Sequence, residues 1–110
     1  MPFDHHLDGR HEKRLPIAVV VRLASLNPLR RDGDEKTYTD NVSAHGARVV
    51  SSHAWQPGEE VQVTPLKYEQ PARGKVVYCR QFAIGYYFVG LNFPERAVHW
   101  SNFTYPGGVM

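Results

Sequence analysis

The chain has 110 residues, of which 42% are hydrophobic and 22% are charged. This length fits one domain that can bury a core without disulfide bonds or metal ions to stabilise it. The formal net charge is +2, and the excess positive charge is not concentrated in a lysine-rich block. This argues against a tail that binds long nucleic acid. A small, multiply charged anion fits this charge balance better than a duplex does.

The first predicted elements are an arm, a strand and a loop. Residues 1–14 are polar, charged and rich in histidine, and Gly9 interrupts any helical pattern, so we expect a mobile arm. Apolar residues alternate from Ile17 to Leu23, which predicts a strand. Residues 27–35 are charged, contain proline and glycine, and lack apolar periodicity, which predicts a loop.

Further strands are expected along the rest of the chain. The β-patterned runs cover residues 38–42, 47–51, 61–63, 73–79 and 86–93. Pro57 and Gly58 stand where a type II turn needs them, at its second and third positions. About six short strands with turn signals between them favour an antiparallel barrel or sandwich over a βαβ fold.

The end of the chain predicts one short helix. Pro94 is placed to open a helical turn, and the glycines after Pro106 must stop it. We expect this helix around residues 95–101. The predicted organisation is a mobile arm, a barrel and a tail, over residues 1–14, 15–103 and 104–110.

Two arginines in the arm form a first motif. Arg10 and Arg14 give the pattern R-x-x-x-R. A guanidinium donates two parallel hydrogen bonds to phosphate oxygens or to the O6 and N7 edge of guanine, and its face stacks on a purine. The same pattern also fits a solvated charged arm, because charge runs usually face solvent.

A second polar motif lies between two predicted strands. The run from Asn41 to Gly46 reads [D/N]-x-S-x-x-G. Asn41 and Ser43 share one face of a strand, so an amide and a hydroxyl can address the Watson–Crick edge of one guanine. Gly46 permits a positive φ or a close backbone approach, and the adjacent Asp40 can supplement Asn41. A plain polar turn would use the same residue types.

Other kinds of site have weaker support. The histidines of the arm have no cysteine partner and no zinc spacing, so we expect no metal. Ser43 lies on no nucleophile elbow, so we expect no enzyme activity. A stacking platform for single-stranded nucleic acid remains an alternative, although such aromatics are more often divided between core and surface. Its members would be Tyr86, Tyr87, Phe88 and Phe93.

The single cysteine and the N-terminus bear on location. Cys79 has no partner for an internal disulfide and stands in an apolar run, where a small hydrophobe is expected. The N-terminus lacks the pattern of an export signal, and the longest apolar run, residues 15–21, is too short to span a bilayer. We therefore expect a cytoplasmic protein without membrane insertion.

Together, the two motifs resemble those of the PilZ domain, a small bacterial β-barrel family that binds the second messenger cyclic di-GMP. The resemblance covers most of the chain and implies an all-β fold, a six-stranded antiparallel PilZ-like β-barrel. Three further segments share the resemblance. Residues 46–51 and 57–61 look like the family's third and fourth strands, and residues 89–93 look like its closing strand.

The resemblance also implies roles for the motif residues. Arg10 and Arg14 would contact phosphate and guanine, and Asn41 and Ser43 would contact guanine, with Gly46 completing the motif. The ligand would be cyclic di-GMP, with no cofactor. The chain departs from the family in its shortened C-terminal helix and in Gly9, where a third basic group is missing.

The implied function is a receptor that relays the second-messenger signal to a downstream protein target. We expect a monomer or weak dimer, with no DNA or RNA partner. One alternative is a degenerate PilZ-like protein-interaction adaptor that does not bind nucleotide. Another is a small barrel that binds single-stranded nucleic acid.

Overall fold

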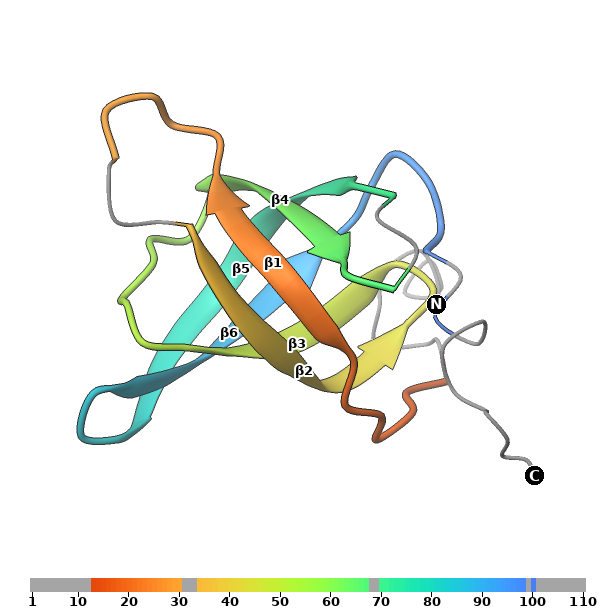
Figure 1. Ribbon diagram of the computed structural model, residues 1–110, viewed down its shortest axis with the longest axis horizontal. Helices are drawn as coiled ribbons and strands as arrows, with labels where there is room; N and C mark the ends of the chain where they lie inside the picture. The colour runs from red at the N-terminus through yellow and green to blue at the C-terminus, as the bar shows by residue number, and fades with distance from the viewer. Residues whose placement is uncertain (1–12, 31–33, 68–69, 99, 101–110) are drawn as a thin grey trace, which may run out of the picture.

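The computed structural model describes residues 13–30, 34–67, 70–98 and 100. The strands in these ranges close into one antiparallel barrel (Figure 1). They are β1 (Val20–Ser25), β2 (Glu35–Ser43), β3 (Gly46–Ser51), β4 (Glu60–Pro65), β5 (Ala72–Ala83) and β6 (Tyr86–Asn92). Around the barrel their order is β1-β2-β3-β6-β5-β4, and β4 pairs back with β1. The predicted all-β, six-stranded antiparallel fold is confirmed.

Alternating side chains fill the barrel. On β1, Val21 and Leu23 have no exposed surface. Val20 lies on the solvent side of the same strand and is 48% exposed. Each such Val or Leu contributes about 1.5–3 kcal/mol when it is fully buried. The side chains with no exposed surface in the apolar core are Val21, Leu23, Val42, Ala47, Val49, Val61, Val63 and Val89.

The predicted type II turn precedes β4. The Glu59 amide donates to the Gln56 carbonyl oxygen at 3.0 Å, which closes the turn. Gly58 has a φ of 91° at the third position, where only glycine is unstrained, and Pro57 occupies the second. The turn prediction is confirmed.

Two strands are longer than their sequence patterns indicated. β2 begins at Glu35 rather than Tyr38, because its first residues pair with β1 in the register Leu23↔Glu35. β5 continues to Ala83 rather than ending at Cys79, because it stays paired with β6 beyond the body of the barrel. In both extensions no residue is buried, so no buried periodicity marked them as strand.

The expected short helix around residues 95–101 does not form over residues 95–98, which are bends and irregular backbone. The amides of Phe93 and Val98 donate instead to the carbonyl oxygens of His45 and Ala44, at 2.8 and 2.7 Å. These bonds tie the segment to the β2–β3 turn. Trp100, in a 3₁₀ turn, is 3% exposed and lies 6.1 Å from the Phe93 ring centre.

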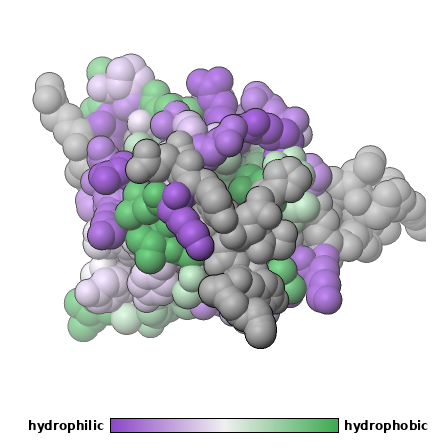
Figure 2. Space-filling view, turned by 45° about the vertical axis from the view of Figure 1, so that its right-hand side comes forward, coloured by the Kyte–Doolittle hydropathy of each residue, from purple (hydrophilic) through white to green (hydrophobic). Residues whose placement is uncertain are grey.

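The outer surface mixes apolar and polar side chains, and Figure 2 shows a hydrophobic area bordered by hydrophilic groups. Among the described residues, most of the large apolar side chains that are exposed come from β5, β6 and the turn between them. These are Val77, Tyr78, Phe82, Ile84 and Tyr86. Within the described ranges, no helix has the length and apolar content needed to cross a membrane.

Candidate ligand-binding site

A short backbone pairing brings the start of the described chain to β2. The Leu15 amide donates to the Val42 carbonyl oxygen at 2.8 Å, and the Val42 amide donates back to the Leu15 oxygen at 2.9 Å. Leu15 also packs against the barrel core. This antiparallel bridge fixes the position of Arg14, which precedes Leu15, on the outer side of β2.

Arg14 lies over the polar motif. Its Nε donates to Asn41 Oδ1 at 2.9 Å, and its Nη1 donates to Ser43 Oγ at 3.3 Å. Because Val42 between them is fully buried, Asn41 and Ser43 both face outward from the strand. The structure therefore brings one arginine of the first motif onto the two polar residues of the second. Arg10 lies outside the described residues.

Gly46 provides space rather than an unusual backbone conformation. Gly46 is not among the glycines with positive φ. A Cβ at Gly46 would lie 3.2 Å from both Leu91 O and Ser43 Oγ, and 3.5 Å from Arg14 Nη1. The missing side chain thus lets the β6 backbone at Leu91 and the Ser43 hydroxyl approach Gly46 closely, whereas Arg14 would remain at ordinary contact distance from a Cβ. Of the two uses of Gly46 that the sequence allowed, the structure has the close approach.

Asp40 is brought into the same cluster by a β-bulge. The β2–β3 register shifts between Thr39 and Asn41, so Asp40 and Asn41 both face the Arg48 side of β3. Arg48 Nε donates to Asp40 Oδ2 at 2.8 Å, and its Nη2 bonds to the same oxygen. Asn41 Nδ2 also donates to this oxygen at 3.1 Å.

The two neighbours of Asn41 fix how its amide is turned. Asp40 accepts from the amide nitrogen, and Arg14 donates to the amide oxygen. Neither partner could satisfy the opposite orientation, because a carboxylate offers no proton and a guanidinium accepts none. Asp40 therefore holds the side-chain amide of Asn41 in this orientation.

Arg48 is a site neighbour that the sequence interpretation missed. Its guanidinium lies 4.1 Å from the centre of the Phe88 ring, a cation–π contact. Burial lowers the pKa of Arg48, but hydrogen bonds to Asp40 and Tyr78 outweigh it, so the pKa is raised above its usual value. The hairpin register pairs Asn41 with Arg48, and that pairing could have been read from the two-residue turn before Gly46.

The cluster can bind an anion that also carries hydrogen-bonding groups. Arg14 supplies a planar set of donors, Asn41 supplies both a donor and an acceptor, and Ser43 supplies a hydroxyl that can do either. Ser43 is 2% exposed, beneath Arg14, so a ligand meets the arginine and the amide first. Phosphate and a purine edge are the groups that such donors recognise.

The predicted aromatic platform is divided between core and surface. Phe93 is 1% exposed and Tyr87 packs against the core, whereas Tyr86 is 52% exposed. Phe88 faces outward but is stacked against Phe82, with ring centres 4.0 Å apart. These four residues do not present the row of open ring faces that base stacking requires.

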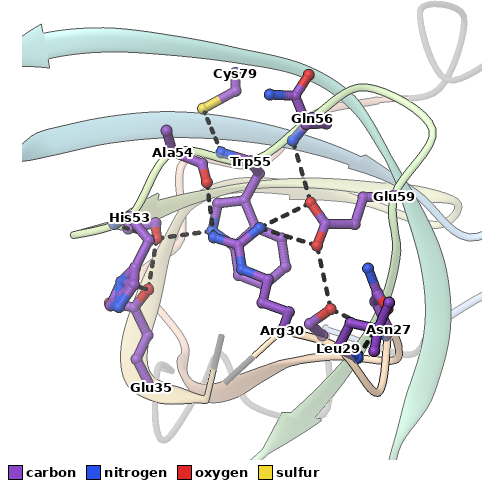
Figure 3. Close-up of polar contacts among 12 residues, drawn as sticks. Asn27, Leu29, Arg30, Glu35, His53, Ala54, Trp55, Gln56, Glu59 and Cys79 are labelled. Carbon is purple, nitrogen blue, oxygen red and sulfur yellow. Dashed lines mark hydrogen bonds and ion pairs between the residues drawn. The ribbon is translucent and has the colours of Figure 1, made fainter. Parts of the chain in front are cut away.

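A second polar cluster closes one end of the barrel (Figure 3). Arg30 Nη1 lies 2.8 Å from Glu59 Oε1, and the guanidinium lies 4.1 Å from the Trp55 ring centre. Arg30 Nη2 also donates to the Ala54 carbonyl oxygen at 2.7 Å. The Trp55 amide donates to Cys79 Sγ at 3.3 Å. Since these groups bond mainly to one another, the cluster holds the β1–β2 loop against the barrel.

The sequence matches the model of a known domain family. The family model described as the PilZ domain matches residues 8–99, which include both motifs and all six strands. A search of curated proteins found no significant match.

Proposed function

The chain belongs to the PilZ domain family, and on this premise we propose that it is a receptor domain for cyclic di-GMP that relays the signal through contact with a downstream protein. PilZ domains are binding domains rather than catalysts. The proposed ligand residues are Arg10, Arg14, Asn41, Ser43 and Gly46, with Asp40 as a supporting residue.

One observation carries the proposal. Arg14 donates to both Asn41 and Ser43, although 27 and 29 residues separate it from them in the sequence. Arg14 of the first motif therefore lies on the same side of the barrel as Asn41 and Ser43, as a common ligand would require. Had Arg14 faced the opposite side, this assignment would have failed.

The chemistry of the ligand suits these groups. Cyclic di-GMP has two phosphates within its ring and two guanines, so it offers anionic oxygens and purine edges together. In the proposed complex, Arg14 exchanges its bonds to Asn41 and Ser43 for bonds to phosphate or guanine. Asn41 then offers its amide to the guanine edge. Each charge-assisted hydrogen bond contributes about 1.5–3 kcal/mol.

The signal in this proposal is a change of surface. A ligand that bridges Arg14 and β2 covers the outer side of the β2–β3 hairpin and brings its own polar groups to that surface. A target protein that recognises the covered surface binds the liganded state better, and only such a difference in affinity can transmit a signal.

Isothermal titration calorimetry of the full chain tests the proposal, with cyclic di-AMP and GTP as control ligands. We expect binding of cyclic di-GMP and much weaker binding of both controls. Arg14→Ala should weaken binding about tenfold or more. Arg22→Ala is the matched control, because Arg22 is an exposed arginine on β1 that pairs with Asp34. Equal affinity of Arg14→Ala and the parent chain would overturn the assignment.

A further inference from the structure

The β5–β6 hairpin extends past the body of the barrel (Figure 1). The β4–β5 ladder ends at Glu60↔Lys75, whereas the β5–β6 ladder continues to Ala83↔Tyr86. Gly85, with a φ of 80°, makes the turn at the tip. This hairpin lies at the end of β6 opposite the β2–β3 turn, and therefore opposite the candidate ligand-binding site.

The tip of the hairpin is apolar and exposed. Ile84 is 95% exposed, Phe82 45% and Tyr86 52%. Phe82 stacks on Phe88 behind the tip, with ring centres 4.0 Å apart and an interplanar angle of 15°. An ordered group of large apolar side chains at a projecting turn is unusual for a surface that meets only water.

The hairpin carries a cation near its tip and no anion. Between Pro71 and Pro94 the sequence has no aspartate or glutamate. Arg80 is the cation nearest the tip, because Arg73 and Lys75 lie on the part of β5 that pairs with β4. Arg80 lies on the same hairpin, with its guanidinium 5.8 Å from the Phe88 ring centre.

An open groove of about 490 Å³ adds a further cation beside the tip. It runs between the hairpin and β2, and Lys36 lines it together with Phe82 and Tyr86. Glu35 also lines this groove, and its carboxylate, which accepts hydrogen bonds from Ser51 and Ser52 and lies 3.6 Å from His53 Nδ1, keeps its negative charge. Lys36 is the exposed one of the two, so its ammonium is the charge that can reach a surface outside the groove.

We propose that the β5–β6 hairpin is a docking element for an anionic lipid surface. Ile84, Phe82 and Tyr86 enter the boundary between headgroups and acyl chains, and Arg80 and Lys36 contact lipid phosphates. Apolar groups at the interface and cations at the headgroups are the two contributions that hold peripheral proteins on membranes. Tyrosine is favoured at this depth because its ring is apolar and its hydroxyl reaches water.

Two other occupants fit the hairpin less well. An added β-strand would need a regular edge, but the β5 ladder to β6 shifts register between Val76 and Tyr78 and again between Gln81 and Ala83, and such bulges turn an edge away from pairing. Single-stranded nucleic acid would need open ring faces, whereas Phe82 stacks on another ring. Neither occupant gives a role to an exposed isoleucine.

This lipid contact goes beyond nucleotide binding and does not depend on it. The tip and the cluster around Arg14 lie at opposite ends of the β3–β6 pair, so a chain that docks tip first keeps the nucleotide site in water. The proposal can therefore fail while the proposed function stands, and the reverse also holds.

Vesicle co-sedimentation of the full chain tests the proposal. The two vesicle types are phosphatidylcholine alone and phosphatidylcholine mixed with phosphatidylglycerol. We expect binding to the mixed vesicles and a steep fall in that binding as salt is raised. Ile84→Ser should lower the partition coefficient about tenfold, since it removes the most exposed apolar side chain. Arg80→Gln should lower it about fivefold.

Leu29→Ser is the matched control, because Leu29 is 87% exposed but lies in the β1–β2 loop. It should bind the mixed vesicles as the parent chain does. The proposal is wrong if the parent chain fails to bind, binds both vesicle types equally, or loses as much binding through Leu29→Ser as through Ile84→Ser. A loss on Arg80→Gln with none on Ile84→Ser would also overturn it, because the apolar tip would then not enter the bilayer.

Discussion

Arg14 and Asn41 are joined by a hydrogen bond of 2.9 Å between Arg14 Nε and Asn41 Oδ1, although they belong to different motifs. The arginine is thus held at the site before any ligand arrives. A ligand that replaces this bond with one to a phosphate orders little additional side chain, which lowers the entropic cost of binding. The bond also uses the Asn41 oxygen, so the ligand must displace Arg14 before that oxygen can meet a guanine.

Replacing Arg14 by lysine separates charge from geometry. Arg14→Lys keeps the positive charge but loses the planar pair of donors, so we expect cyclic di-GMP affinity to fall about tenfold in calorimetry. Thermal unfolding should change little, because the Arg14 side chain is on the surface. Unchanged affinity would mean that Arg14 acts as a point charge only.

Two substitutions of Asp40 should differ in their effect on affinity. Asp40→Asn retains an oxygen that accepts from Asn41 Nδ2 and Arg48, and it removes a negative charge near an anionic ligand. Asp40→Ala removes the acceptor, so neither of its two present partners orients the Asn41 amide once the ligand has displaced Arg14. We therefore expect Asp40→Ala to bind cyclic di-GMP more weakly than Asp40→Asn, by titration under identical salt. The reverse order would contradict the positioning role of Asp40.

Gly46→Ala should weaken both the fold and the site. The added Cβ would lie 3.2 Å from Leu91 O, a backbone atom that cannot move easily, and equally close to Ser43 Oγ. We expect the free energy of unfolding to fall by about 1–2 kcal/mol, measured by urea denaturation, and the affinity for cyclic di-GMP to fall as well.

Gly85→Ala is the control for this substitution. Gly85 has a φ of 80° and open space around its Cβ position, so alanine there strains only the backbone. It should lower stability by about 1 kcal/mol and leave nucleotide affinity unchanged. If Gly46→Ala also leaves affinity unchanged, the close contact between Gly46 and Ser43 has no part in binding.

The sequence predicted those features that depend on local pattern. Alternation from Ile17 to Leu23 identified the buried face of β1, although the strand begins only at Val20, and Pro57-Gly58 identified a turn. Both signals lie within a few residues. The motif run from Asn41 to Gly46 was placed correctly at the β2–β3 turn for the same reason.

Features that depend on pairing between distant segments could not be predicted in the same way. The bulge at Asp40 exists only in register with β3, and it is what brings Arg48 to the site. The expected helix after Pro94 was lost to backbone bonds with the β2–β3 turn, which no local propensity encodes. The charged loop before Glu35 likewise gave no sign that Arg30 would pair with Glu59.

The Arg30–Glu59 pair should contribute more to stability than any exposed ion pair on this barrel. The two side chains are only 15% and 10% exposed, and Glu59 also accepts bonds from Ser25 Oγ and the Gln56 amide. Glu59→Ala would leave a guanidinium partly buried without its carboxylate, so we expect a loss of about 3 kcal/mol in the free energy of unfolding. Asp34→Ala, which breaks a 3.8 Å pair that is 53% and 65% exposed, should cost less than about 1 kcal/mol. Urea denaturation of both variants measures the difference, and equal losses would mean that the cluster around Trp55 does not hold the loop through its charges.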